Sequence, residues 1–115
     1  MNNAQGRKEK IASYKQRTMV GGVYSITNTQ SKKKLLCCTT DLRGSKNRFD
    51  FSVMTDSCVN IKLKEDWNLL GAGAFVFEAL EEVTQKETQT EAELSEEVAV
   101  LRQLWEERIG ADMLY

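Results

Sequence analysis

Cationic side chains cluster in the first half of the sequence, where they could bind the phosphates of a polyanion. Three consecutive lysines come first, and three further cations follow within one short segment. Each contact with a nucleic-acid phosphate would release counterions, so that affinity would fall with salt. The same charges also suit a solvated turn and helix surface, and the sequence leaves both interpretations open. The candidate nucleic-acid-binding residues are Lys32, Lys33, Lys34, Arg43, Lys46 and Arg48.

Charge is distributed unevenly along the chain. Residues 1–50 carry 11 Lys and Arg against 3 Asp and Glu, a balance of +8, whereas residues 51–115 carry 5 against 14, a balance of −9. Such an asymmetry can mark a basic face for a polyanion, or it can let basic and acidic elements of one fold attract each other.

Composition is typical of a single small domain. The 115 residues are 41% hydrophobic and 29% charged, which suits one modest core. No stretch resembles a membrane helix or an apolar signal-peptide region, so the expected location is the cytoplasm and no membrane partner is expected. Cys37, Cys38 and Cys58 have no C-x-x-C spacing and the chain contains no histidine, so we expect reduced thiols and no zinc site.

The first 40 residues or so predict a basic arm followed by a β-hairpin. Residues 1–18 are polar and basic with scattered apolar Ile11 and Tyr14, which predicts either a loosely ordered arm or a short docked helix. Residues 20–27 are rich in β-prone side chains and predict a strand. Turn-forming residues follow, and the short apolar run over 33–39 predicts a second strand.

Two helices are predicted next. The carboxylate of Asp41 can cap a short helix over about 41–50. Asp56 or Ser57 can cap a second helix, which Gly71 ends. The apolar stripe of this second helix is expected to consist of Val59, Leu63, Trp67 and Leu70.

The remainder of the chain predicts a strand, a loop and a long helix. Residues 74–80 are aromatic and branched, which predicts a third strand, and the polar residues 81–89 predict an exposed loop. Thr90 and Glu93 have the spacing of a capping box, and the apolar stripe that follows predicts a helix over 91–109. Trp105 belongs to this stripe and is expected in the core.

Together these elements predict the α+β class, with a small three-stranded antiparallel sheet flanked by helices. The domain is expected over 19–110, between the basic N-terminal arm of 1–18 and a C-terminal tail of 111–115.

Two parts of the sequence resemble the GIY-YIG nuclease superfamily. The run Gly22-Val23-Tyr24, followed by Ile26 and Asn28, resembles its G-[IV]-Y-x-I-x-N opening strand. Residues 60–81 resemble a divergent bacterial branch through the run L-x-E-D-W-N-x-x-G-x-x-x-F-x-F-E-x-L-E. The resemblance spans most of the chain and implies a GIY-YIG-like fold. Because most of these residues are packing residues, it supports fold better than activity.

The resemblance also implies a chemistry, the hydrolysis of a DNA phosphodiester. In the superfamily a tyrosine activates water, an arginine stabilises charge and a glutamate holds one Mg²⁺. Tyr24 matches the tyrosine. The arginine position falls on Ser45, with Arg48 one turn further along the helix and Arg43 near its start as substitute cations. The resemblance therefore makes Tyr24 and Arg48 the catalytic candidates.

Other positions depart from the superfamily pattern. The second half of the motif falls on Leu35-Leu36-Cys37, without its tyrosine and glycine. The glutamate position falls on Arg102, whose guanidinium cannot ligate Mg²⁺ and would repel it. Glu106, four residues further on, is a substitute carboxylate. No cofactor is therefore expected, and Mg²⁺ is expected only if the chain is a nuclease.

Three hypotheses follow. In the first, the chain is a catalytically degenerate domain that serves as a nucleic-acid-binding or regulatory module, with DNA as the partner. In the second, it is a divergent metal-dependent endonuclease. In the third, it is a protein-interaction domain that kept only the scaffold, with a partner that the sequence does not identify. The departures at the metal and arginine positions favour the first.

Overall fold

The computed structural model describes residues 18–115, so the predicted arm lies outside the described residues except for Thr18. The three strands form one antiparallel sheet in the order β2-β1-β3, which confirms the predicted class and sheet. The elements are β1 (Val20–Asn28), β2 (Lys34–Thr39), α2 (Leu42–Thr55), α3 (Lys64–Leu70), β3 (Phe75–Thr84) and α4 (Glu91–Ile109), with 3-10 turns at Ile61–Leu63, Ala72–Ala74 and Ala111–Met113.

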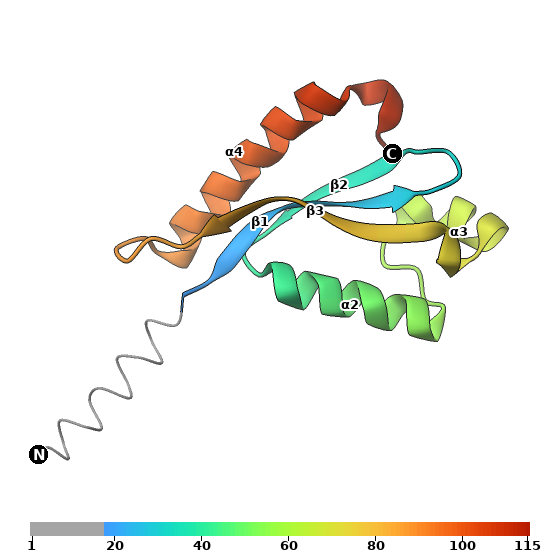
Figure 1. Cartoon of the computed structure of the whole chain (residues 1–115), viewed down its shortest axis with the longest axis horizontal. Helices are drawn as coiled ribbons and strands as arrows, with labels where there is room; N and C mark the ends of the chain where they lie inside the picture. Colours follow the sequence, from blue (N-terminus) through green and yellow to red (C-terminus); the bar gives the residue numbers. More distant parts are fainter. Residues whose placement is uncertain (1–17) are drawn as a thin grey trace, which may run out of the picture.

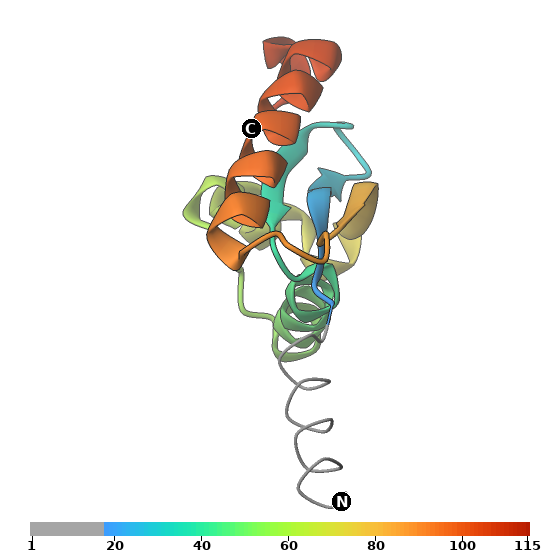
Figure 2. The same cartoon turned by 90° about the vertical axis from the view of Figure 1, so that its left-hand side faces the viewer.

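Helices cover both faces of the sheet. α4 packs against β1 and β2, and α2 packs against β1 and β3, on opposite sides of the sheet (Figures 1 and 2). Because successive side chains of a strand alternate in direction, β1 contributes to two cores. Ile26 joins Phe49 of α2 in one cluster. Val23 points the other way, toward the face where Leu94 and Val98 of α4 are buried.

The predicted hairpin is confirmed, and Asn28 at its turn connects three parts of the chain. Asn28 is 1% exposed, and its Oδ1 accepts hydrogen bonds from two turn amides at 2.8 and 3.2 Å. Its Nδ2 donates to Asp66 of α3 at 3.3 Å and to the Tyr115 hydroxyl oxygen at 2.8 Å. The backbone amide of Tyr115 also donates to the Lys34 carbonyl at 2.9 Å. Residues 111–115, expected as a tail, therefore lie against the hairpin.

α2 begins where predicted but ends later. Asp41 caps the helix by accepting a hydrogen bond from the Gly44 amide at 3.0 Å. The predicted end near residue 50 is wrong, because α2 continues to Thr55. The extension buries Ser52, whose hydroxyl donates to the Phe49 carbonyl at 2.6 Å and is thereby satisfied within the helix. Asp56, with a φ of 54°, caps the end of α2 rather than the start of the next helix.

The second predicted helix begins later than predicted. Asn60, rather than Asp56 or Ser57, caps the 3-10 turn before α3 by accepting from the Lys62 amide at 2.8 Å. The predicted end at Gly71 is confirmed. Of the predicted apolar stripe, Leu63 and Trp67 are buried, whereas Val59 and Leu70 are 44% and 40% exposed.

β3 is longer than predicted and approaches β1 closely. Residues 81–84, expected in a loop, continue the strand by pairing with the start of β1, and a β-bulge shifts the register between Val23 and Tyr24. A Cβ atom on Gly22 would lie 2.0 Å from the carbonyl oxygen of Glu81. The glycine of the Gly22-Val23-Tyr24 run is therefore required by the distance between the two strands.

α4 matches its predicted bounds and its capping box. The Thr90 hydroxyl accepts from the Glu93 amide at 3.1 Å, and the Glu93 carboxylate accepts from the Thr90 amide at 2.9 Å. Trp105, expected in the core, is only half-buried, and its indole nitrogen donates to Glu81 of β3 at 2.7 Å. Across residues 18–115 we find no helix with the length and apolar character that crossing a bilayer requires.

Candidate functional site

Tyr24 lies on the sheet face that α2 covers. Its ring stacks on Phe77 of β3, with centroids 4.5 Å apart and an interplanar angle of 21°. Cys37 is its partner across the β1–β2 ladder, so the phenol and the thiol lie on the same face. Ser45 and Arg48 of α2 complete the surroundings, since both act on the ionisation of the Tyr24 hydroxyl.

The Arg48 guanidinium turns back along α2 toward the helix start. Its Nη2 donates to the Ser45 hydroxyl at 3.1 Å, and the Ser45 hydroxyl donates to Thr39 Oγ1 at 3.0 Å. Ser45 is buried, while Arg48 is exposed to solvent. Arg48 thus brings a cation to the neighbourhood of Tyr24, where Ser45 replaces the arginine that the sequence resemblance implies.

The Tyr24 phenol is held in its protonated form. Burial raises its pKa from 10.0 to about 12, and the Cys37 thiol adds to this rise, while the Ser45 hydroxyl and the Arg48 charge oppose it. Burial also raises the pKa of Cys37, although contact with Tyr24 lowers it. The phenol and the thiol lie close enough to share a hydrogen bond. At neutral pH both remain protonated.

A tyrosine titration should show this directly. We expect Tyr24→Phe to remove a step near pH 12 from the phenolate absorbance of the folded protein. Because the folded pKa lies above the ordinary 10.0, the protonated phenol stabilises the fold fully below pH 10, and this contribution is lost as the pH rises to about 12. A titration above pH 10 that Tyr24→Phe leaves unchanged would contradict the buried phenol.

The residues around Tyr24 do not fit a divalent metal ion. Mg²⁺ is held by carboxylates, carbonyls and water, whereas the side chains here are a thiol, a hydroxyl and a guanidinium. Arg102 stands at the implied ligand position, and its Nη1 pairs with Glu106 Oε2 at 3.8 Å. Within residues 18–115, no group of three or more His, Cys, Asp or Glu side chains could hold a metal ion.

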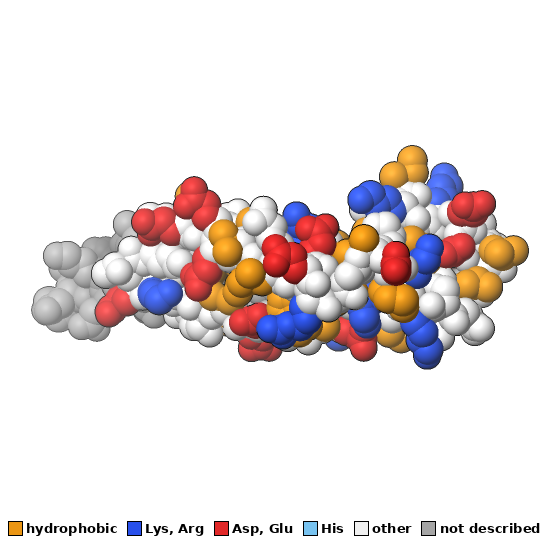
Figure 3. Space-filling view, turned by 90° about the horizontal axis from the view of Figure 1, so that it is seen from above, with side chains coloured by type: hydrophobic (Ala, Val, Ile, Leu, Met, Phe, Trp, Pro, Cys, Tyr) orange, Lys and Arg blue, Asp and Glu red, His pale blue; other side chains and the backbone are white. Residues whose placement is uncertain are grey.

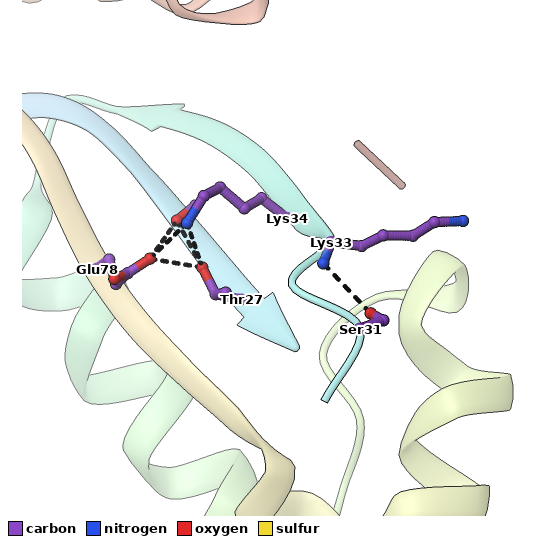
Figure 4. Close-up of polar contacts among 6 residues, drawn as sticks. Thr27, Ser31, Lys33, Lys34 and Glu78 are labelled. Carbon is purple, nitrogen blue, oxygen red and sulfur yellow. Dashed lines mark hydrogen bonds and ion pairs between the residues drawn. The ribbon is translucent and has the colours of Figure 1, made fainter. Parts of the chain in front are cut away.

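The three hairpin lysines differ in their polar contacts and in their exposure to solvent. Lys34 Nζ lies 2.9 Å from Glu78 Oε1 and 3.2 Å from Thr27 Oγ1, and Figure 4 shows Lys34 crossing β1 toward Glu78 while Lys33 points away. Hydrogen bonds from Thr27 and Lys34 lower the pKa of the Glu78 carboxyl, so the pair stays charged. Lys34 is therefore engaged within the sheet, whereas Lys32 and Lys33 are exposed.

The structure does not bring the two predicted cation groups together. The hairpin turn precedes β2 and α2 follows it, so the hairpin lysines and Arg43 lie at opposite ends of a six-residue strand, which is about 20 Å long. Lys34 also contacts Thr27, whose side chain lies on the face of β1 opposite to Tyr24 and Arg48. Lys46 is in an exposed ion pair with Asp50 at 2.9 Å, and Arg43 is exposed at the start of α2. Of the six candidates, Arg48 is the one whose charge acts on Tyr24.

One end of the α4 side of the molecule is a poor surface for a polyanion. Figure 3 views this side and shows acidic side chains gathered over one end, with basic side chains mainly over the other. Phosphates would be repelled from the acidic end. The first two turns of α4 contain Glu91, Glu93, Glu96 and Glu97.

Sequence reasoning did not assign Cys37 or Lys62 to this site. The charges of Arg102 and Lys62 both favour the thiolate of Cys37, so three cationic side chains, counting Arg48, act on the Tyr24–Cys37 pair. The register of the hairpin was the available signal, because counting outward from the turn pairs Cys37 with Tyr24. No local pattern pointed to Lys62, which precedes α3.

Comparison with known proteins shows that the fold is similar to that of solved structures. The sequence matches no family model and no curated protein. One similar solved structure is the catalytic domain of intron endonuclease I-TevI, in a point mutant, with 21% identity, a TM-score of 0.57, and coverage of 78% of this chain and 84% of that chain. Another is the catalytic domain of homing endonuclease I-TevI, with 20% identity, a TM-score of 0.57, and coverage of 76% and 86%.

Proposed function

Since the chain has the GIY-YIG-like fold that its sequence predicted, we propose that it is a catalytically degenerate domain that binds nucleic acid, with DNA as the expected partner. It would serve as a binding or regulatory module rather than as an enzyme. We place it in the cytoplasm, where the unpaired thiols of Cys37, Cys38 and Cys58 would remain reduced.

The observation that carries this proposal is the set of donors around the Tyr24 hydroxyl. The Arg48 guanidinium and the Ser45 hydroxyl meet beside it, and the Arg102 and Lys62 charges act on the adjacent Cys37. A phosphate oxygen accepts hydrogen bonds, and guanidinium groups bind phosphate with matched geometry. The site therefore suits a phosphate that is held in place.

The same site lacks what cleavage requires. Attack on a phosphodiester needs a group that removes a proton from water. A phenol with a pKa of about 12 keeps its own proton at neutral pH, so it donates a hydrogen bond and cannot accept the proton. The cation that would stabilise developing charge beside a metal is present as Arg48, but Arg102 stands where the metal ligand is implied. These features favour binding without hydrolysis.

Charge reversal at Arg48 tests the binding. We expect the wild type to bind labelled DNA at low salt, with affinity falling as salt rises, and Arg48→Glu to weaken binding by about tenfold and reduce the salt dependence by about one phosphate contact. Lys86→Glu makes the same change of charge on the β3–α4 connection and should leave affinity within about twofold. Fluorescence anisotropy measures affinity, and circular dichroism checks that both variants are folded.

Two results would overturn the proposal. Absence of DNA binding by the wild type at low salt would favour the protein-interaction hypothesis. Equal losses in Arg48→Glu and Lys86→Glu would mean that binding follows net charge rather than the Tyr24 site.

The divergent-nuclease hypothesis has support from one observation, the retention of Tyr24 with Arg48 beside it. We expect supercoiled plasmid to stay intact with the purified protein in Mg²⁺ or Mn²⁺, because the implied metal-ligand position is an arginine. Nicking that requires the metal and disappears in Tyr24→Phe would establish the nuclease instead. Nicking that persists in Tyr24→Phe would indicate a contaminating enzyme.

A further inference from the structure

An open groove lies beside the Tyr24 site, between the outer face of α2 and the segment that leads to α3. Its volume is about 440 Å³, within the range of small-ligand sites, about 300–1,000 Å³. Arg48, Phe51 and Thr55 line it from α2, at the spacing of successive helical turns, and Cys58 and Val59 line the opposite wall.

The walls of this groove are apolar and exposed. Phe51 is 62% exposed and Val59 is 44% exposed, although both are large apolar side chains. Phe51 is absent from the core cluster that contains Phe49, so its ring is available to a ligand. An aromatic face that is open to solvent offers a stacking surface for another planar ring.

Arg48 belongs to both the groove and the Tyr24 site. It lines the groove and donates to Ser45 beside Tyr24. A phosphate bound at Arg48 would therefore place the rest of its nucleotide next to Phe51. A second groove, of about 510 Å³, is lined by Glu106 and Glu107, whose charges would repel a phosphate. Charge thus favours the α2 groove as the site for a nucleotide.

We propose that the α2 groove holds one unpaired nucleobase of a single-stranded nucleic acid, stacked on Phe51, while Arg48 contacts the adjoining phosphate. The proposal rests on the nucleic-acid binding proposed above and specifies the kind of strand. Bases of a duplex are stacked on one another, whereas an unpaired base exposes its face to an aromatic side chain. The contact depends on the base's face, so it tolerates any sequence and accepts DNA or RNA.

Anisotropy with matched oligonucleotides tests this. The probes are a labelled DNA strand of about ten nucleotides, its duplex, the RNA strand, and an abasic strand with the same phosphates. We expect the wild type to bind the DNA and RNA strands more tightly than the duplex or the abasic strand. Phe51→Ala should weaken single-strand binding by about tenfold and leave duplex and abasic binding unchanged. Met54→Ala is the matched control, because Met54 is 77% exposed on the same helix and does not line the groove.

The failure of this inference differs from the failure of the proposed function. Binding that Arg48→Glu weakens but Phe51→Ala leaves unchanged would overturn the base site and keep the phosphate site. Equal affinity for the intact and abasic strands would also overturn the base site and keep the phosphate site. Equal losses in Phe51→Ala and Met54→Ala would also overturn the base site, since the loss would follow the helix surface. Absence of binding to every probe at low salt would overturn both proposals.

Discussion

Gly22→Ala is expected to lower the free energy of unfolding by about 3 kcal/mol. The new Cβ would lie 2.0 Å from the Glu81 carbonyl oxygen and 3.0 Å from Leu42 Cδ1. The carbonyl belongs to the backbone of β3 where it pairs with β1, so it cannot retreat without breaking the ladder beside the bulge. Urea denaturation followed by circular dichroism measures the loss. A secondary effect on DNA binding is expected, because Tyr24 lies two residues away.

Gly73→Ala provides the matched control. A Cβ at Gly73 would meet no atom within 4 Å. The substitution should change the free energy of unfolding by less than about 1 kcal/mol, because it adds no contact and only restricts the unfolded chain. If both variants unfold at the same urea concentration, the close approach of β1 and β3 at Gly22 is not a constraint on the sequence.

Leu63→Ala is expected to destabilise the protein by about 2–5 kcal/mol. Leu63 is 0% exposed and belongs to the cluster in which Trp67 and Phe75 stack at 5.2 Å. Removing its side chain leaves a cavity beneath α3. Leu69→Ala makes the same chemical change in the same region at a side chain that is 77% exposed, and should cost less than about 0.5 kcal/mol. Similar losses in the two variants would contradict the orientation of α3.

The sequence predicted the elements whose signals are local. The capping box of Thr90 and Glu93 and the apolar stripe behind it define α4 from adjacent residues alone, and the structure agrees with the predicted bounds. The Asp41 cap and the Gly71 stop are equally local. These features could be predicted because their hydrogen bonds join residues within about one helical turn.

Ends of elements that depend on distant partners were predicted wrongly. The sequence of 81–84 is polar enough for a loop, but it becomes part of β3 because β1 offers a free edge from Val20 onward. α2 continues past residue 50 to Thr55, and this extension packs Ser52 into the buried interior. That extension places Phe51 on a helix face, and the sequence alone gave no indication of the groove it lines.

The candidate site was predictable in part. The resemblance pointed to Tyr24, and it identified Arg48 as a substitute cation one turn past Ser45; the structure brings the Arg48 guanidinium to Ser45. It could not foresee that Lys34 would be paired with Glu78, because that contact crosses β1 and depends on sheet order.

β3 is an edge strand of the sheet, and its sequence affects whether two copies of the protein can pair edge to edge. An edge strand exposes unpaired backbone N–H and C=O groups, which can form hydrogen bonds with a strand of another molecule. β3 contains Glu78, Glu81 and Glu82, so pairing of β3 with β3 of a second copy would bring like charges together. The protein should therefore resist stacking into larger assemblies at neutral pH.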